Sequence, residues 1–516
     1  MQLFLNPFKK TDHFDVAEVV VPLEYASQRD SDSERGITIE VLKEEIDNDL
    51  QSGGVDTAYD RKSKVINRAI SDIGMGRYQW ELFTLCGFGW MADNLWLQGV
   101  ALTLTPMAAE FGIGGTQIRY TTLSLFTGLC IGASFWGTAS DIVGRRLAFN
   151  CTLFLAGTFG LAAGGAPSWI GACALYACVG LGVGGNLPVD GALFLEFLPF
   201  ASGNLLTLLS VWWPVGQLIS SLVAWGFIPN YSCPSEGPGS TSCVLTGGEQ
   251  PCCSKENNMG WRYFILTIGA LTFLMFILRF FFFHLYESPK YLLSRGRQDE
   301  AIAVVHGIAH KNKTKTWLTA EILDSVGGSV QVNKKEKLSN VEIIKRSLGK
   351  FSTDRIGPLF KGTRLAIATV LLWFTWATIG MGYPLFNAFL PQYLENSGSG
   401  APTSTNIVYR NYAITSIVGV PGSLLACYTL EALFQNIMYG VLYAYTPEVF
   451  PAPNRGTGSG IASFLNRVAG LCAPIVAVQA GASNPLAPIY ASGALFLAAF
   501  VAMVLLPIET MGRQVL

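Results

Sequence analysis

Eleven apolar blocks follow one another along this chain, and most are close to the length of one membrane crossing. A helix needs about 20 mainly apolar residues to span the hydrocarbon core of a bilayer, where only helices and closed barrels satisfy every backbone polar group. We therefore predict an all-α polytopic membrane protein. The predicted segments cover residues 82–106, 119–139, 147–164, 170–195, 205–229, 261–284, 365–390, 410–429, 430–445, 458–480 and 486–507.

The basic residues of the connecting segments predict the orientation of these helices, because cytosolic loops carry an excess of Lys and Arg. Arg145 and Arg146 follow the second block, and a basic stretch at 285–364 follows the sixth. Both belong on the cytosolic side. Two helical sets joined by a long cytosolic linker are typical of secondary transporters, whose solute site lies between the sets at the bilayer midplane. The loops predicted on the opposite side carry no charge at 112–116, 165–169 and 481–485.

The spacing of the blocks divides the chain into five parts. Within the first part, residues 65–76 have the spacing of an amphipathic helix on the membrane surface, although a plain linker explains them equally well. The remainder of that part is polar and is expected to be mostly disordered. The five parts are a cytosolic N-terminal tail (1–79), an N-terminal six-helix bundle (80–284) with a cysteine-rich non-cytosolic loop (229–260), a cytosolic basic linker (285–364), an incomplete C-terminal helical bundle (365–507) and a cytosolic tail (508–516).

Composition supports a membrane protein and excludes several other classes. Half of the residues are hydrophobic and only 14% are charged, with a mean hydropathy of +0.37. The formal net charge of −1 creates no field that would attract nucleic acid. The four histidines have no metal-ligand spacing with cysteine, and no Gly-x-x-x-x-Gly-Lys-Ser/Thr loop is present. We expect no enzymatic activity, no cofactor and no metal, and an energy source in an ion or solute gradient.

Four of the eleven cysteines lie in the predicted non-cytosolic loop: Cys233, Cys243, Cys252 and Cys253. An oxidising compartment on that side permits disulfides. A variable surface loop with free thiols is the alternative.

Four short motifs are typical of one transporter family. GTASDIVGRR at 137–146 joins a glycine, an acid that can cap a helix and paired arginines into a charge latch at the cytosolic face. ESPKYLL lies at 287–293, PEVFPAPNRGTG at 447–458 and PIETMGR at 507–513. Together these stretches resemble the motifs of the major facilitator superfamily and, within it, of the sugar porters. Other stretches, such as GFGWMAD at 87–93, are most similar to the branch with synaptic-vesicle-glycoprotein-like transporters and their fungal relatives.

The resemblance implies a major facilitator fold of two six-helix bundles that moves a small-molecule solute across a lipid bilayer by alternating access. The host membrane is expected to be the plasma membrane or an endomembrane, vacuolar or vesicular. The resemblance also implies a gating role for loop-motif residues through salt bridges between helices. These residues are Gly137, Asp141, Gly144, Arg145, Arg146, Glu196, Glu448 and Arg455.

Departures from the sugar-porter pattern argue against a hexose as the solute. The stretch at 375–387 reads TWATIGMGYPLFN, where hexose porters have Gln-Gln-x-x-Gly-Ile-Asn. Gln217 matches a sugar-contacting glutamine, but Ser210 replaces an earlier one. A polyhydroxylated sugar needs many polar partners, because each buried unpaired donor costs about 1–3 kcal/mol.

Two acidic residues within the apolar segments are candidates for proton coupling, since intramembrane acids are commonly functional. Asp93 matches the helix-one acid of proton-coupled sugar porters, and the position of its usual arginine partner is Tyr176 here. Without a fixed cation, a buried carboxylate favours its neutral form. Hydrogen bonding to local hydroxyls or to Asn94 is the alternative. Asp190 is either a second coupling residue or an acid that is solvated or paired near the cytosolic helix end.

Arg467 lies about three turns inside the predicted eleventh helix of the fold. A cation at that depth needs a carboxylate from the protein or from the solute, or else carbonyl oxygens of a helix end. If Arg467 and Asp93 both face the central cavity, they can pair in the empty state and a solute anion can displace that pair. The predicted solute-binding residues are Gln217, Arg467, Trp90 and Trp376, although each tryptophan on its own is equally explained by packing.

Two functional classes remain open. The first is a transporter of a small organic solute, proton-coupled or facilitative, with an organic anion as one candidate. The second is a transporter-like receptor or regulator that no longer transports, or an inactive truncated isoform.

The junction after Thr429 bears on that choice. The segment 410–429 ends inside by alternation, yet the motif at 447–458 also belongs inside, so one span at 430–445 cannot connect them. The simplest explanation is an internal loss of about forty residues, the length of a latch loop, helix nine and part of helix ten. A long tilted or re-entrant helix is the alternative.

Overall fold

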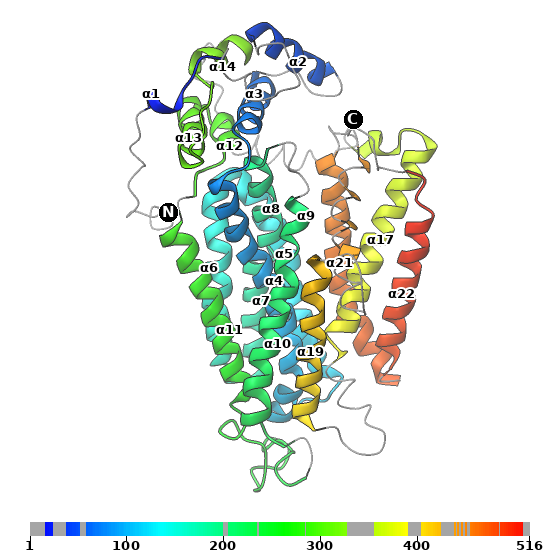
Figure 1. Cartoon of the computed structure of the whole chain (residues 1–516). Helices are drawn as coiled ribbons and strands as arrows, with labels where there is room; N and C mark the ends of the chain where they lie inside the picture. The colour runs from blue at the N-terminus through cyan, green and yellow to red at the C-terminus, as the bar shows by residue number, and fades with distance from the viewer. Residues whose placement is uncertain are drawn as a thin grey trace.

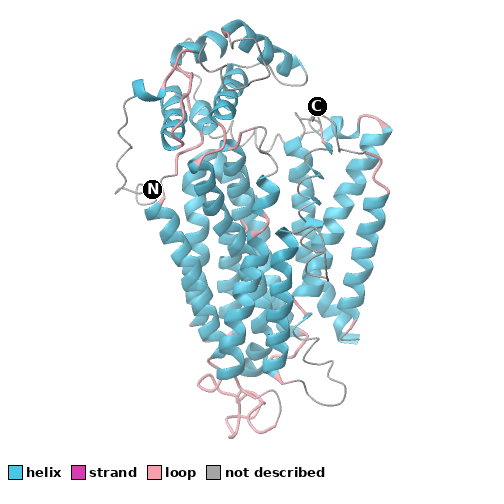
Figure 2. Ribbon diagram, in the orientation of Figure 1, coloured by secondary structure: helices cyan, strands magenta, loops and turns pink. Residues whose placement is uncertain are grey.

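A computed structural model gives the architecture. It describes residues 16–23, 38–51, 58–199, 205–234, 237–283, 285–327, 356–390, 404–424, 438–439, 441–442, 445–446, 449–450, 455–483 and 486–508. Long helices run side by side in one bundle, and a small group of short helices covers one end of it (Figure 1). Helices dominate the described chain, and its loops gather at the two ends of the bundle (Figure 2).

The N-terminal half contains the helices of the first six predicted segments. Helix pairs α4–α10, α5–α7 and α6–α11 pack along their lengths. Glycine permits the closest of these approaches, since a Cβ on Gly180 would meet the backbone oxygen of Leu125. The helices are α4 (Arg77–Phe111), α5 (Tyr120–Val143), α6 (Arg145–Gly164), α7 (Trp169–Val183), α8 (Asn186–Phe197), α9 (Leu205–Leu209), α10 (Trp212–Tyr231) and α11 (Gly260–Ile277), with the 3₁₀ turn η3 (Gln117–Arg119) before α5 and the π-helical turn η5 (Leu278–Phe282) after α11.

The C-terminal half is described through four long helices: α17 (Thr363–Asn387), α19 (Thr405–Leu424), α21 (Arg455–Ser483) and α22 (Ala487–Val504). Helix α17 packs against both α21 and α22. Helix α19 packs along α10 of the N-terminal half, and α21 packs along α5 (Figure 1). The two halves therefore meet along two helix pairs, α10–α19 and α5–α21.

The prediction of an all-α polytopic architecture is confirmed. Within the part of the chain that the structure describes, six helical stretches are long and apolar enough to cross a membrane. Ten of the eleven predicted segments coincide with described helices, two of them broken by a turn, at Gly184–Gly185 and at Ser210–Val211. The eleventh, 430–445, lies mostly outside the described residues, as does the junction after Thr429.

A compact helical domain covers the end of the N-terminal half that is predicted to be cytosolic. The predicted amphipathic segment forms α3, but its apolar face does not lie on a membrane surface. Val65, Ile66, Ala69 and Ile70 are at most 1% exposed, because linker helices α12 and α14 pack on them. The domain comprises α1 (Val16–Val19), α2 (Ile39–Gln51) and α3 (Ala58–Ile73) from the N-terminal tail, and α12 (Pro289–Ser294), α13 (Gln298–Lys311) and α14 (Ala320–Gly327) from the linker.

Polar contacts join the two parts of this cytosolic domain. Lys62 on α3 contacts Asp324 on α14 at 2.6 Å, and the backbones of Val20 and Thr316 form a parallel bridge. The described parts of the predicted disordered tail, α1 to α3, are thus folded against the linker. A short 3₁₀ turn, η7 (Gly357–Phe360), precedes α17.

The cysteine-rich loop lies at the opposite end of the bundle. Its four cysteines form two disulfides, Cys233–Cys253 and Cys243–Cys252. The Ser242 hydroxyl donates a hydrogen bond to the backbone oxygen of Glu110 at 2.7 Å, which fixes the loop to the last turn of α4. The disulfides agree with a non-cytosolic position for this end of the protein.

Candidate transport site

A small cavity of about 70 Å³ lies between the two halves. It holds a few water molecules at most, since pockets for drug-sized ligands measure about 300–1,000 Å³. The site is therefore nearly closed in this conformation. Its lining comes from both halves and comprises Asp93, Asn94, Leu97, Phe126, Leu187, Trp213, Gly380, Tyr383, Pro384, Tyr439, Asn466 and Arg467.

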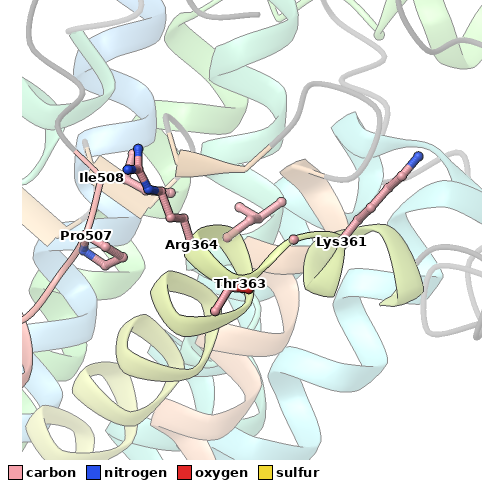
Figure 3. Close-up of a pocket in the computed structure, with 7 residues that line it drawn as sticks. Lys361, Thr363, Arg364, Pro507 and Ile508 are labelled. Carbon is pink, nitrogen blue, oxygen red and sulfur yellow. The ribbon is translucent and has the colours of Figure 1, made fainter.

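A larger, open depression of about 580 Å³ lies at the cytosolic end of the C-terminal half, between the start of α17 and residues 507–508 (Figure 3). Its polar side chains, Lys361, Thr363 and Arg364, are all exposed. Because it lies away from the interface of the halves, we assign it no role in transport.

Asp93 is the acidic group of the central cavity. Its side chain is 3% exposed, and its Oδ1 accepts a hydrogen bond from Asn186 Nδ2 at 3.3 Å. The break between α7 and α8 places Asn186 in this position, where the same amide also donates to the Gly89 backbone oxygen at 3.1 Å. The second oxygen, Asp93 Oδ2, is buried and has no hydrogen-bond partner among the described residues.

Arg467 of α21 provides the cationic group and lines the same cavity as Asp93. No described carboxylate lies within 4.0 Å of its guanidinium, so the predicted direct pair with Asp93 is not formed in this conformation. The neighbouring Asn466 donates to the Trp376 backbone oxygen at 3.1 Å. A cation and an acid thus share one small space between the halves without contacting each other.

Aromatic rings form much of the remaining wall. Trp213 stacks on Trp90 with ring centres 5.0 Å apart, and it also meets Tyr439, with ring centres 5.6 Å apart. Tyr439 in turn meets the edge of Tyr383 at 5.6 Å. The cavity therefore has an aromatic wall beside its charged groups.

The other predicted solute-binding residues lie outside the cavity lining. Trp90 is buried behind Trp213. Trp376 donates its indole N–H to Thr446 Oγ1 at 2.9 Å within the C-terminal core. Gln217 is buried in α10. The prediction missed Asn466, Tyr383 and Tyr439, although Asn466 adjoins Arg467 and Tyr383 lies in the stretch that replaces the hexose motif.

Asp190 is not part of the cavity. It forms an ion pair with Arg279 of η5 at 3.0 Å, and both side chains are fully buried. Arg279 also donates to the backbone oxygens of Phe149 at 2.7 Å and Leu85 at 2.5 Å. This arrangement favours the paired alternative for Asp190, with a partner that the sequence analysis had not identified.

A second buried pair lies at the non-cytosolic end of the same half. Glu110 of α4 pairs with Arg262 of α11 at 2.5 Å and accepts a hydrogen bond from the Trp261 indole at 2.8 Å. Arg262 also donates to the backbone oxygens of Gly164 and Ala166. The N-terminal half thus has an internal ion pair near each end.

The described residues with a predicted gating role contact one another at the end of the bundle predicted to be cytosolic. Arg145 contacts Glu196 at 2.9 Å. Glu287 of the linker accepts the backbone N–H groups of Arg145 at 2.9 Å and Arg146 at 3.3 Å, and therefore caps the start of α6. Burial raises the pKa of Glu287, and these hydrogen bonds offset part of that rise.

Glycine is required at one of these gating positions. Gly144, with φ of 105°, lies in the region that favours glycine, and a Cβ there would press on Glu287. Gly137 lies within α5. Glu448 and the side chains of Asp141 and Arg455 lie outside the described part of the chain.

A cavity between two helical halves, lined by charged groups of both, is the arrangement expected of a polytopic membrane transporter. Residues 83–426 match the Major Facilitator Superfamily. The chain belongs to this superfamily, as predicted from its motifs, and it is a membrane transport protein rather than an enzyme.

Several curated relatives extend over most of the chain. An MFS siderochrome iron transporter 1 of Ceriporiopsis subvermispora is 41% identical over 505 positions, which cover 90% of this chain and 94% of the relative. A synaptic vesicle 2-related protein of Xenopus laevis is 26% identical over a match that covers 87% of this chain and 82% of the relative. Among solved structures, the proton:xylose symporter XylE shares the fold with a TM-score of 0.56 at 17% identity, covering 85% of this chain and 98% of that one.

One comparison bears on the junction after Thr429. An MFS-type transporter of Schizosaccharomyces pombe is 37% identical over 561 positions, covering 98% of this chain and 97% of the relative. Because this chain has 516 residues, at least 45 of those 561 positions have no residue in it. The superfamily match also ends at residue 426, shortly before Thr429.

The buried Asp190–Arg279 pair leads to a prediction about stability. Asp190→Asn alone should lower the free energy of unfolding by about 3–5 kcal/mol, because it leaves the Arg279 charge buried without a counter-charge. The double variant Asp190→Asn/Arg279→Met should recover a large part of that loss. Thermal unfolding of the detergent-solubilised protein measures both. Equal destabilisation by the single and the double variant would contradict the proposed coupling.

Proposed function

We propose that this protein is a proton-coupled transporter of small organic anions, in which Asp93 carries the proton and Arg467 binds the anionic group of the solute. The host membrane is the plasma membrane or an endomembrane. The observation that carries the proposal is the position of Asp93 and Arg467 on the wall of one cavity between the two halves. The two residues come from different halves, α4 and α21, so rocking of the halves changes their surroundings together.

The contacts of Asp93 support a proton-carrying role. A buried polar oxygen without a partner costs about 1–3 kcal/mol, and a charged one costs more. Asn186 stabilises one oxygen of Asp93, while the other is buried and without a described partner. Proton binding at Oδ2 removes the uncompensated charge. The proton can leave when the cavity opens to water on the opposite side.

The surroundings of Arg467 support an anionic solute. A guanidinium presents parallel N–H donors that match a carboxylate in a bidentate arrangement. No described protein carboxylate occupies that position. The aromatic wall formed by Trp213, Tyr383 and Tyr439 can contact an apolar solute body. The stretch at 375–387, which lacks the hexose-binding glutamines, contributes only Gly380, Tyr383 and Pro384 to the lining, so a hexose is a poor fit.

Asp93→Asn should uncouple solute movement from the proton gradient while leaving the cavity intact. The experiment uses proteoliposomes with a trapped pH-sensitive dye and a panel of radiolabelled small carboxylates. At a pH difference of about two units, one proton per anion sustains up to about 100-fold accumulation. The wild-type protein should accumulate at least one carboxylate together with proton influx, whereas Asp93→Asn should only exchange it to equal concentrations.

Glu249→Gln is the matched control, because Glu249 is an exposed acid in the non-cytosolic loop. It should behave as the wild-type protein. Accumulation by Asp93→Asn at the wild-type level would refute proton coupling through Asp93.

A second candidate function follows from the comparison of lengths. If the positions missing relative to the fission-yeast protein lie after Thr429, the C-terminal half lacks helix nine and part of helix ten. Such a chain is a transporter-like protein that binds a solute without completing the transport cycle. The end of the superfamily match at residue 426 supports this placement of the loss.

Insertion of the corresponding segment of the Ceriporiopsis subvermispora relative between Thr429 and Leu430 distinguishes the two functions. If the chain is incomplete, the extended protein should accumulate carboxylates in proteoliposomes and the 516-residue protein should not. Equal transport by both proteins would show that the chain is complete for its function.

A further inference from the structure

Arg119 connects the two halves at the non-cytosolic end of the bundle. It ends the turn η3 just before α5 and is only 7% exposed. Its Nη1 donates a hydrogen bond to the backbone oxygen of Ala477 in α21 at 2.6 Å. Its guanidinium carbon lies 5.0 Å from the centre of the Phe389 ring, just beyond the end of α17. One arginine of the N-terminal half thus contacts two elements of the C-terminal half.

The local shape of α21 accommodates this arginine. A Cβ atom on Gly481 would overlap the Arg119 guanidinium. Gly481 lies one turn beyond Ala477 on the same helix, so a hydrogen-bond acceptor and a small residue face the guanidinium together. This is an independent sign that the two surfaces fit each other at this point.

The Arg119 contact lies on the same pair of helices as the central cavity, nearer to the non-cytosolic end. Phe126 of α5 lines the cavity, seven residues after Arg119, and its ring would meet a Cβ atom on Gly470 of α21. Gly470 is seven residues before Ala477. Seven helical residues correspond to about 10 Å. The Arg119 contact therefore closes the interface about two helical turns to the non-cytosolic side of the cavity.

We propose that Arg119 is the latch of the non-cytosolic gate. Its contacts with Ala477 and Phe389 hold α5 and α21 together, and they break when the cavity opens to the non-cytosolic side. A charge-assisted hydrogen bond and a cation–π contact exist in the closed state, and water solvates the guanidinium in the open state. The inference rests on transport by alternating access, and it is independent of proton coupling and of the solute.

Accessibility of the cavity tests the latch without a known solute. A cysteine introduced at Leu97 reports from the cavity wall, and a membrane-impermeant maleimide is added from the non-cytosolic side of sealed vesicles. Labelling is taken as the difference from the same protein without the Leu97→Cys change. Arg119→Ala should increase the labelling rate about tenfold or more, the effect of losing one charge-assisted hydrogen bond from the closed state.

Arg410→Ala is the matched control, because Arg410 is an exposed arginine on α19 near the same end of the bundle. It should leave the labelling rate unchanged.

Gly481→Ala provides a second test from the opposite surface, since the added methyl group displaces the guanidinium without removing the charge. It should also increase labelling, and it decides the question if Arg119→Ala does not reach the membrane. An unchanged labelling rate in the folded variants, or an equal increase with Arg410→Ala, would overturn the proposal.

Discussion

The cost of placing charge inside a bilayer governs the arrangement of this protein. A buried ion is stable only when a counter-charge and hydrogen-bonding groups replace the lost water. The N-terminal half meets that requirement twice, with Asp190–Arg279 between α8 and η5 and with Glu110–Arg262 between α4 and α11. In both pairs the arginine also donates to backbone oxygens of a further helix. The half is therefore held as one body by two ion pairs that lie outside the cavity lining.

Asp93 and Arg467 differ from those pairs in position and in contacts. They lie at the interface of the halves rather than within one of them, and they do not contact each other. In the proposed mechanism, Asp93 is therefore available to a proton and Arg467 to an anion. Arg119 belongs to the same interface, but it closes the non-cytosolic side with a carbonyl oxygen and an aromatic ring. In the proposed mechanism, charges inside the half serve rigidity, and charges between the halves serve movement.

The sequence predicts the helices well and the charge pairs poorly. Apolar block length locates ten segments, because the bilayer imposes one length on every span. The partner of Asp190 is not predictable in this way, since Arg279 lies 89 positions away and only the packing of α8 and α11 against α6 brings the two together. The apolar face of α3 is visible in the sequence, but periodicity does not distinguish a membrane surface from the linker helices that cover it. The resemblance to sugar porters identified Asp93, and the depth of a cation within an apolar segment identified Arg467. The aromatic wall depends on how the two halves meet.

The central claim is that Asp93 holds an exchangeable proton within the cavity. Infrared difference spectroscopy of the protein in membranes, with and without a transported carboxylate, observes the carboxylic acid C=O stretch directly. If Asp93 holds such a proton, the wild-type protein should show a protonated-carboxyl band that changes when the solute binds and that is absent in Asp93→Asn. An identical difference spectrum in the wild-type protein and Asp93→Asn would contradict it.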